Sequence, residues 1–288
     1  MTPAQRFHGL DFLRASMMLL GVLLHAACNY LPGPPDGGWP ARDPAVSPAA
    51  GLLVLFIHAF RMPAFFLLAG FFGAMMLERR GVAGMATDRL RRIGLPLLIG
   101  WIVIFPMVKA AFVLAAVRGT TPDLASAIMA FPREAIAHPW ASPGPAHLWF
   151  LWYLLWLYPL AVIVTIACRW LRPLWREYFI RVVDASIVSR YRGIILGLAW
   201  TPFLLPMKHA SVDTPTSFAI NPAILAAYAF PFLVGWRLWY RMDVIAALAA
   251  AASRRLRTVA LLAAMACLCL VASLIAAGAR PSAIGSVI

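Results

Sequence analysis

Residues 11–31 read DFLRASMMLLGVLLHAACNYL, a run of mostly hydrophobic side chains with few charges. A helix needs roughly 20 mostly apolar residues to cross the hydrocarbon core of a bilayer. This stretch has that length, and similar stretches follow near residues 51–77, 93–117, 147–168, 193–207, 222–240 and 258–278. The sequence therefore predicts an all-α, polytopic membrane helix bundle with about seven transmembrane helices.

The composition of the whole chain agrees with this class. The chain has 288 residues, of which 62% are hydrophobic and only 12% are charged. A soluble globular domain is about half apolar and about a quarter charged. The charged residues are too few to cover the surface of a soluble fold. Because neither a tandem repeat nor a low-complexity linker separates the spans, we predict a single membrane domain over residues 1–288.

The positive charge indicates how the chain is oriented. A net charge of +14 is typical of nucleic-acid binders, but here the arginines lie in short loops between apolar stretches. Loops 78–92 and 169–192 hold eleven of the 23 arginines, and the intervening loops are poorer in arginine and rich in proline and glycine. Because cytoplasmic loops carry the excess of Lys and Arg, we predict a cytoplasmic N-terminus, the lipid bilayer as a partner and no nucleic-acid partner.

The first predicted span carries two ionisable side chains at helical spacing. Arg14 and His25 are three turns apart, so they project from one face at a separation of roughly 16 Å. Asp11 lies one turn before Arg14 and is expected to pair with it. Asn29 lies one turn after His25 and is expected to orient its ring. Ionisable residues inside a membrane are costly, so each is a functional hypothesis by default.

Further polar residues map to the outer half of the membrane. The second predicted span carries His58 and Arg61 on one face, and Pro63 is expected to bend the helix there. His147 opens the fourth span and Trp149 follows it, either in an interfacial aromatic belt or as a substrate platform. None of the four cysteines has a histidine at metal-ligand spacing, and we predict no metal site and no disulfide.

These residues leave two kinds of function open. Histidine is the usual proton acceptor for activating a hydroxyl, and arginines near the cytoplasmic face suit a polyphosphorylated ligand. The pattern fits either transfer chemistry with an anionic cytoplasmic donor or proton-coupled transport of a glycan or small solute. Arg79, Arg80 and Arg91 are interpreted as orientation charges.

Four motifs resemble those of acyltransferase family 3, a family of membrane O-acyltransferases. Arg14 and His25 with ten residues between them look like its R-x10-H signature, and RLRR at 89–92 looks like its R-x-x-R motif. HAFRMPAFFLLAGFF at 58–72 and HLWFL at 147–151 are similar to the glucan biosynthesis protein C branch, which succinylates osmoregulated periplasmic glucans. The resemblance runs from about residue 6 to residue 235.

The resemblance implies transfer of an acyl group, succinyl or acetyl, from cytoplasmic acyl-CoA to a hydroxyl of a periplasmic or cell-surface glycan. It implies a multi-pass protein of the bacterial inner membrane, with acyl-CoA as co-substrate and no permanently bound cofactor. Arg14, Arg89 and Arg92 would bind the donor phosphates. The glycan acceptor would be the second partner.

The same resemblance assigns catalytic and acceptor-side residues. His25 would be the general base, with Arg14 and Arg61 in the catalytic set. Arg61 would stabilise the oxyanion or hold an acyl carboxylate. The expected acceptor-side residues are His58, His147 and Trp149.

Members of the family usually have about ten spans, so this chain is expected to be C-terminally short. A non-catalytic membrane subunit is therefore a third hypothesis.

Overall fold

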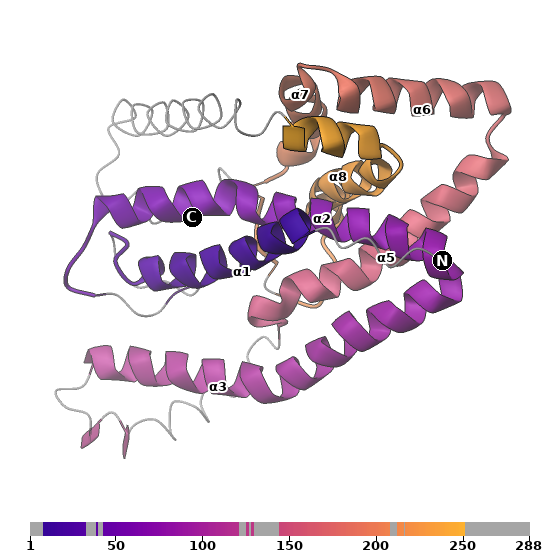
Figure 1. The fold of residues 1–288 in the computed structure, drawn as a ribbon. Helices are drawn as coiled ribbons and strands as arrows, with labels where there is room; N and C mark the ends of the chain where they lie inside the picture. Colours follow the sequence, from indigo (N-terminus) through magenta and orange to yellow (C-terminus); the bar gives the residue numbers. More distant parts are fainter. Residues whose placement is uncertain are drawn as a thin grey trace.

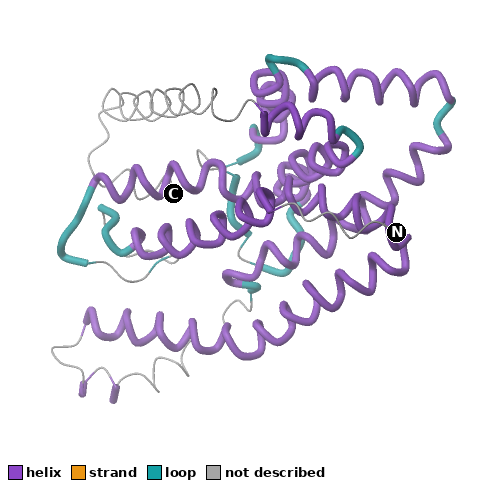
Figure 2. The backbone as a smooth tube through the Cα atoms, viewed as in Figure 1, coloured by secondary structure: helices purple, strands orange, loops and turns teal. Residues whose placement is uncertain are grey.

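The computed structural model describes residues 8–32, 39, 43–120, 125–126, 128–129, 144–207, 212–215 and 217–250. Throughout these residues the regular structure is helical, as Figures 1 and 2 show, which confirms the all-α class. The predicted helix at 258–278 lies outside the described residues. The elements are α1 (His8–Cys28), α2 (Pro48–Arg89), the π-helical turn η1 (Leu90–Gly94), α3 (Leu95–Thr120), the 3-10 turn η2 (Ala146–Leu148), α5 (Trp149–Trp170), α6 (Pro173–Val188), α7 (Arg192–Leu204) and α8 (Pro222–Trp239).

Four stretches of the described chain are long and apolar enough to cross a membrane. They are His8–Cys28, Pro48–Ala115, Ala146–Trp170 and Pro222–Trp239. The predicted fifth span corresponds to α7, which has 13 residues and is about 20 Å long at 1.5 Å per residue. This is shorter than the roughly 30 Å of a bilayer core. The chain is therefore a multi-pass membrane protein, and the count of seven spans stays a prediction.

The longest of these stretches is a helical hairpin. Pro48–Ala115 covers 68 residues, and Figure 1 shows the chain reversing its direction towards the C-terminal end of the purple α2, before the magenta α3. Within α2 the residue with non-helical backbone angles is Gly81, at φ 66° and ψ −176°. A positive φ is open to glycine at little steric cost. Pro63, where we predict a bend, lies inside α2 and is not the turning point.

The basic loop predicted at 169–192 contains a helix. This helix, α6, packs against α7, and Figure 1 shows it running along the edge of the molecule. Its Asp184 accepts hydrogen bonds of 2.7 and 2.8 Å from Arg237 of α8. A long-range carboxylate–guanidinium pair of this kind leaves no hydrophobic period in the sequence, so the helix was not predicted.

The core forms where α2 crosses α8. A methyl group added at Gly70 would overlap the carbonyl oxygen of Phe232, and one at Gly235 would overlap that of Leu67. Small residues let membrane helices approach backbone to backbone, where van der Waals packing replaces the hydrophobic driving force. This crossing, with α5 packed beside it, fixes the position of the residues described next.

Candidate active site

Two histidines predicted for the site lie against each other. His25 is near the end of α1 and His147 is in η2, and their ring centroids are 4.6 Å apart at an interplanar angle of 76°. His25 is half-buried, whereas His147 is exposed. His58 of α2 is an electrostatic neighbour of His25. The fold therefore brings three histidines from distant parts of the sequence into one region, which we call the histidine cluster.

Trp39 covers the histidine cluster from the loop after α1. Its ring is nearly parallel to that of His25, with centroids 5.5 Å apart, and is edge-on to His147 at 6.4 Å. Its indole Nε1 donates a 2.7 Å hydrogen bond to Oδ1 of Asn29. Asn29 therefore accepts a hydrogen bond from Trp39, and Trp39 stacks on the His25 ring. We expected Asn29 to orient that ring directly, whereas the structure connects the two residues through Trp39. Sequence reasoning missed Trp39 because its loop has no periodic pattern.

Arg61 lies beneath His25, against the same face of α1. A methyl group at Gly21, one turn before His25, would overlap the Arg61 guanidinium. Arg61 Nε and His25 Nδ1 are buried and have no hydrogen-bond partner among the described residues. Buried polar atoms are normally hydrogen-bonded. Because these two atoms lie beside each other's side chains, this region offers hydrogen-bonding groups to a polar ligand or to water.

Trp149 belongs to the packed core next to Arg61. It is 6% exposed, and its ring centroid lies 5.3 Å from that of Tyr228. Tyr228, which is 1% exposed, is an electrostatic neighbour of Arg61. A residue of an interfacial belt would face lipid, so the buried position of Trp149 disfavours that interpretation. Tyr228 could not be selected from the sequence, because it is one of several buried residues in the hydrophobic helix α8.

A second group of charged residues lies where α2 passes into η1. Asp88 is 8% exposed and pairs with Arg89 Nη2 at 3.1 Å and with Arg92 Nε at 3.0 Å. Arg80 Nη1 lies 4.0 Å from the same carboxylate. We call these four residues the arginine cluster. It contains the predicted donor residues Arg89 and Arg92, together with an acidic residue that the sequence analysis did not select.

Tyr158 of α5 joins Arg89 to Arg14. Arg89 Nη1 donates a 3.2 Å hydrogen bond to the Tyr158 hydroxyl, which in turn donates to the carbonyl oxygen of Ala69 at 3.2 Å. Arg14 is an electrostatic neighbour of Tyr158, and its ion pair with Asp11, at 3.8 Å, confirms the predicted pairing. Since α1 is continuous from Arg14 to His25, these two side chains are about 16 Å apart along the axis.

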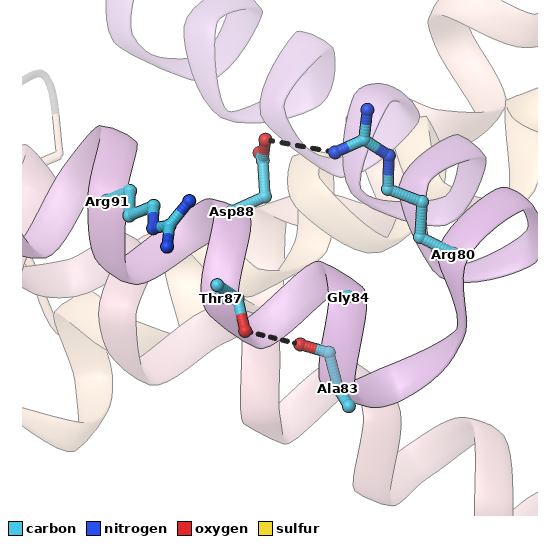
Figure 3. Close-up of a pocket in the computed structure, with 6 residues that line it drawn as sticks. All are labelled: Arg80, Ala83, Gly84, Thr87, Asp88 and Arg91. Atoms are coloured by element: carbon cyan, nitrogen blue, oxygen red, sulfur yellow. Dashed lines mark hydrogen bonds and ion pairs between the residues drawn. The ribbon is translucent and has the colours of Figure 1, made fainter.

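The arginine cluster borders a hollow of about 340 Å³. Figure 3 shows Arg80 and Arg91 on opposite sides of it, with Asp88 and Thr87 between them. Both arginines were interpreted as orientation charges, and the structure places them on the wall of a cavity. Two charged sites thus lie at opposite ends of α1: an arginine-rich one and a histidine-rich one.

The sequence is similar to a known protein family and to curated members of one group of proteins. The family model described as an acyltransferase domain matches residues 7–285. Among curated proteins, glucans biosynthesis protein C of Shigella dysenteriae serotype 1 is 28% identical over 240 residues, and that of Escherichia coli O157:H7 is 27% identical over 240 residues. Each alignment covers 83% of this chain and 56% of the relative, so the chain spans little more than half the length of these relatives. No solved structure matches the chain significantly.

Proposed function

Because the chain belongs to acyltransferase family 3, we propose that it is a membrane O-acyltransferase that uses cytoplasmic acyl-CoA to acylate a glycan hydroxyl on the periplasmic side. The observation that carries the proposal is the pairing of two charged sites along one continuous helix, with Arg14 near one end and His25 near the other. Their separation of about 16 Å matches an extended pantetheine arm, which joins the nucleotide phosphates of CoA to its thioester.

The arginine end suits the donor. Guanidinium groups bind phosphate oxygens through a planar fork that keeps its charge at every physiological pH. Arg92 is 75% exposed and reaches the surface, while Arg89 is 15% exposed and held inside. Arg14, also exposed, completes the set on the neighbouring helix. Positive loops face the cytoplasm in membrane proteins, and this is where acyl-CoA is made.

The histidine end suits the transfer step. His25 accepts the proton of the glycan hydroxyl while the hydroxyl oxygen attacks the thioester carbonyl carbon. The carbonyl oxygen becomes an oxyanion, which Arg61 stabilises from its position beneath His25. The intermediate collapses with cleavage of the carbon–sulfur bond, and the proton on His25 passes to the leaving CoA thiolate. His58 and His147 border the acceptor's approach.

Arg61 also bears on which acyl group is moved. A succinyl group ends in a carboxylate, and a buried guanidinium is its natural partner, whereas an acetyl group needs none. The curated relatives carry glucan biosynthesis in their name, which favours a glucan as acceptor and the bacterial inner membrane as location. Succinyl-CoA and acetyl-CoA compared as donors, in wild type and in Arg61→Gln, distinguish the two acyl groups.

The deciding experiment measures transfer of labelled acyl groups from acyl-CoA to periplasmic glucans in membranes. We expect His25→Ala to abolish transfer, since the base is lost. His8→Ala, at the exposed start of the same helix, is the matched control and should transfer at the wild-type rate. Equal transfer by His25→Ala and wild type would refute the mechanism. Glycan flux in proteoliposomes without covalent modification would instead establish the transporter.

A further inference from the structure

We infer that Asp88 and Tyr158 are positioning residues that hold Arg89 and Arg92 in the geometry that binds the phosphates of the donor. This inference rests on the proposed function and adds residues to its donor site. It starts from a feature that the transfer chemistry does not use: a carboxylate, almost completely buried, inside a group of arginines.

Asp88 fixes two arginines at once. Its Oδ2 meets Arg89 Nη2 at 3.1 Å and its Oδ1 meets Arg92 Nε at 3.0 Å. A buried carboxylate is costly unless charged partners compensate it. Here the compensation restrains two side chains that otherwise have large rotamer freedom.

Arg89 is restrained from a second side by α5. Its Nη1 donates to the hydroxyl of Tyr158, and its guanidinium carbon lies 5.0 Å from the centroid of the Tyr158 ring. Tyr158 is 3% exposed and is itself anchored on Ala69 of α2. Arg89 is therefore held between a carboxylate of its own helix and a hydroxyl of another, and both of its terminal nitrogens are engaged. Its role is to anchor the cluster, and the exposed guanidinium of Arg92 is the group presented to the phosphates.

The atoms used distinguish positioning from competition. An acidic residue that merely occupied the site in place of the donor would engage the forked end of Arg92. The closest contact between Asp88 and Arg92 instead involves Nε of Arg92, at 3.0 Å from Oδ1. The Arg92 side chain is 75% exposed, and its ion-pair partner Asp88 lines the hollow in Figure 3. Asp88 thus restrains Arg92, while most of the Arg92 side chain stays exposed to solvent and accessible to phosphate.

The test is steady-state transfer by the 288-residue chain in nanodiscs with two donors, acyl-CoA and acyl-pantetheine, which lacks the nucleotide phosphates. We expect Asp88→Asn, which weakens two ion pairs, and Tyr158→Phe, which removes one hydrogen bond to a charged group, each to raise KM for acyl-CoA about tenfold. The kcat for acyl-CoA should stay within about twofold, and the kinetics with acyl-pantetheine should be unchanged. A residue with only a structural role would affect both donors alike.

Two control variants match these changes. Tyr153→Phe removes a hydroxyl from another buried tyrosine of α5, which accepts a hydrogen bond from the Asn221 backbone at 3.3 Å and meets no arginine in the described contacts. Asp184→Asn neutralises a carboxylate bound to Arg237, away from the cluster. Both should leave KM for acyl-CoA unchanged. Asp88→Glu keeps the charge and should retain a lower KM than Asp88→Asn.

Each other outcome overturns the inference in its own way. Tighter use of acyl-CoA by Asp88→Asn would make Asp88 a competitor of the phosphates. Equal losses with both donors would make the two residues structural, and unchanged kinetics would give them no role. If Asp88→Asn does not fold, the KM values of Asp88→Glu and Tyr158→Phe for acyl-CoA test the inference. If the wild-type protein shows no transfer that depends on acyl-CoA, the proposed function itself is refuted. This result differs from the outcomes above, in which the wild type transfers the acyl group and only the role of Asp88 and Tyr158 fails.

Discussion

Gly21 lies on the same face of α1 as Arg14 and His25, roughly 20° from Arg14 and roughly 40° from His25 around the helix axis. Its missing side chain makes room for the Arg61 guanidinium directly beneath His25. The position of one glycine therefore determines how close the arginine of α2 comes to the histidine of α1. The two unpartnered atoms, His25 Nδ1 and Arg61 Nε, lie next to this contact.

We predict that Gly21→Ala lowers the transfer rate by at least about tenfold, because the methyl group displaces Arg61 from the oxyanion position. The helix itself should not weaken, since alanine favours a helix over glycine by about 1 kcal/mol. The check is the transfer rate together with the thermal melting temperature. Gly9→Ala is the control on the same helix, because a methyl group there meets nothing within 4 Å. An active Gly21→Ala enzyme would contradict the placement of Arg61.

At the scale of elements, the crossing of α2 and α8 sets the frame on which Arg61 and Tyr228 face each other. Backbone contact at Gly70 and Gly235 leaves no room for any side chain. We predict that Gly235→Ala destabilises the protein by about 1–3 kcal/mol, as overpacking does. Thermal unfolding in detergent measures this. Gly197→Ala on α7, where a methyl group meets nothing within 4 Å, should leave the melting temperature unchanged.

The link between α6 and α8 should depend on pH. The hydrogen bonds from Arg237, together with the charge of Arg241, hold the pKa of Asp184 below its usual range. A carboxyl group whose pKa falls on folding stabilises the fold above its unfolded pKa of about 4. That stability is lost as the pH falls through the lower, folded pKa.

We therefore predict that Asp184→Asn destabilises by about 2 kcal/mol at pH 7, and that the difference from wild type shrinks below about pH 4. Melting temperatures of both proteins across pH 3–8 provide the measurement. Glu177→Gln removes an exposed pair with Arg181 and should change stability by less than about 1 kcal/mol. A difference between Asp184→Asn and wild type that is constant with pH would contradict the assignment.

At the scale of the whole molecule, the predicted cytoplasmic N-terminus would place the two charged sites on opposite sides of the membrane. We predict that a cysteine at Thr87, on the exposed end of α2, reacts with a membrane-impermeant maleimide only after the inner membrane is opened. A cysteine at Asp43, before α2, should react in intact spheroplasts. Both residues are exposed, so they are matched for access, and the background replaces the native cysteines. The reverse labelling pattern would place the arginine cluster outside the cell.

The elements that could be predicted from the sequence are those set by local hydrophobicity. The first and fourth predicted spans correspond to α1 and α5, since a long apolar run has one stable form in a bilayer. The turn at Gly81 was not predicted, because a single residue with positive φ carries no hydrophobic signal. The charged helix α6 was missed for a related reason: four ionised residues broke the apolar pattern.

The residues of the candidate site also fall into two groups, those that could be predicted from the sequence and those that could not. His25, Arg61 and His147 were selectable because ionisable residues in apolar stretches are conspicuous, and the fold brings them together. Trp39, Asp88 and Tyr158 were missed because each matters through contacts with distant residues. A tryptophan in a loop, an acid among arginines and a tyrosine in an apolar helix are ordinary until the helices are packed.

The single-residue turn at Gly81 has a consequence for the energetics of donor capture. Only one residue separates the two limbs of the hairpin, so Arg89 and Arg92 project from helical backbone on the returning limb and not from a long loop. A ligand that binds groups already fixed in place spends little of its affinity on ordering them. The capture of acyl-CoA should then be a single-step association without a slow closing phase, and its observed rate should rise linearly with donor concentration.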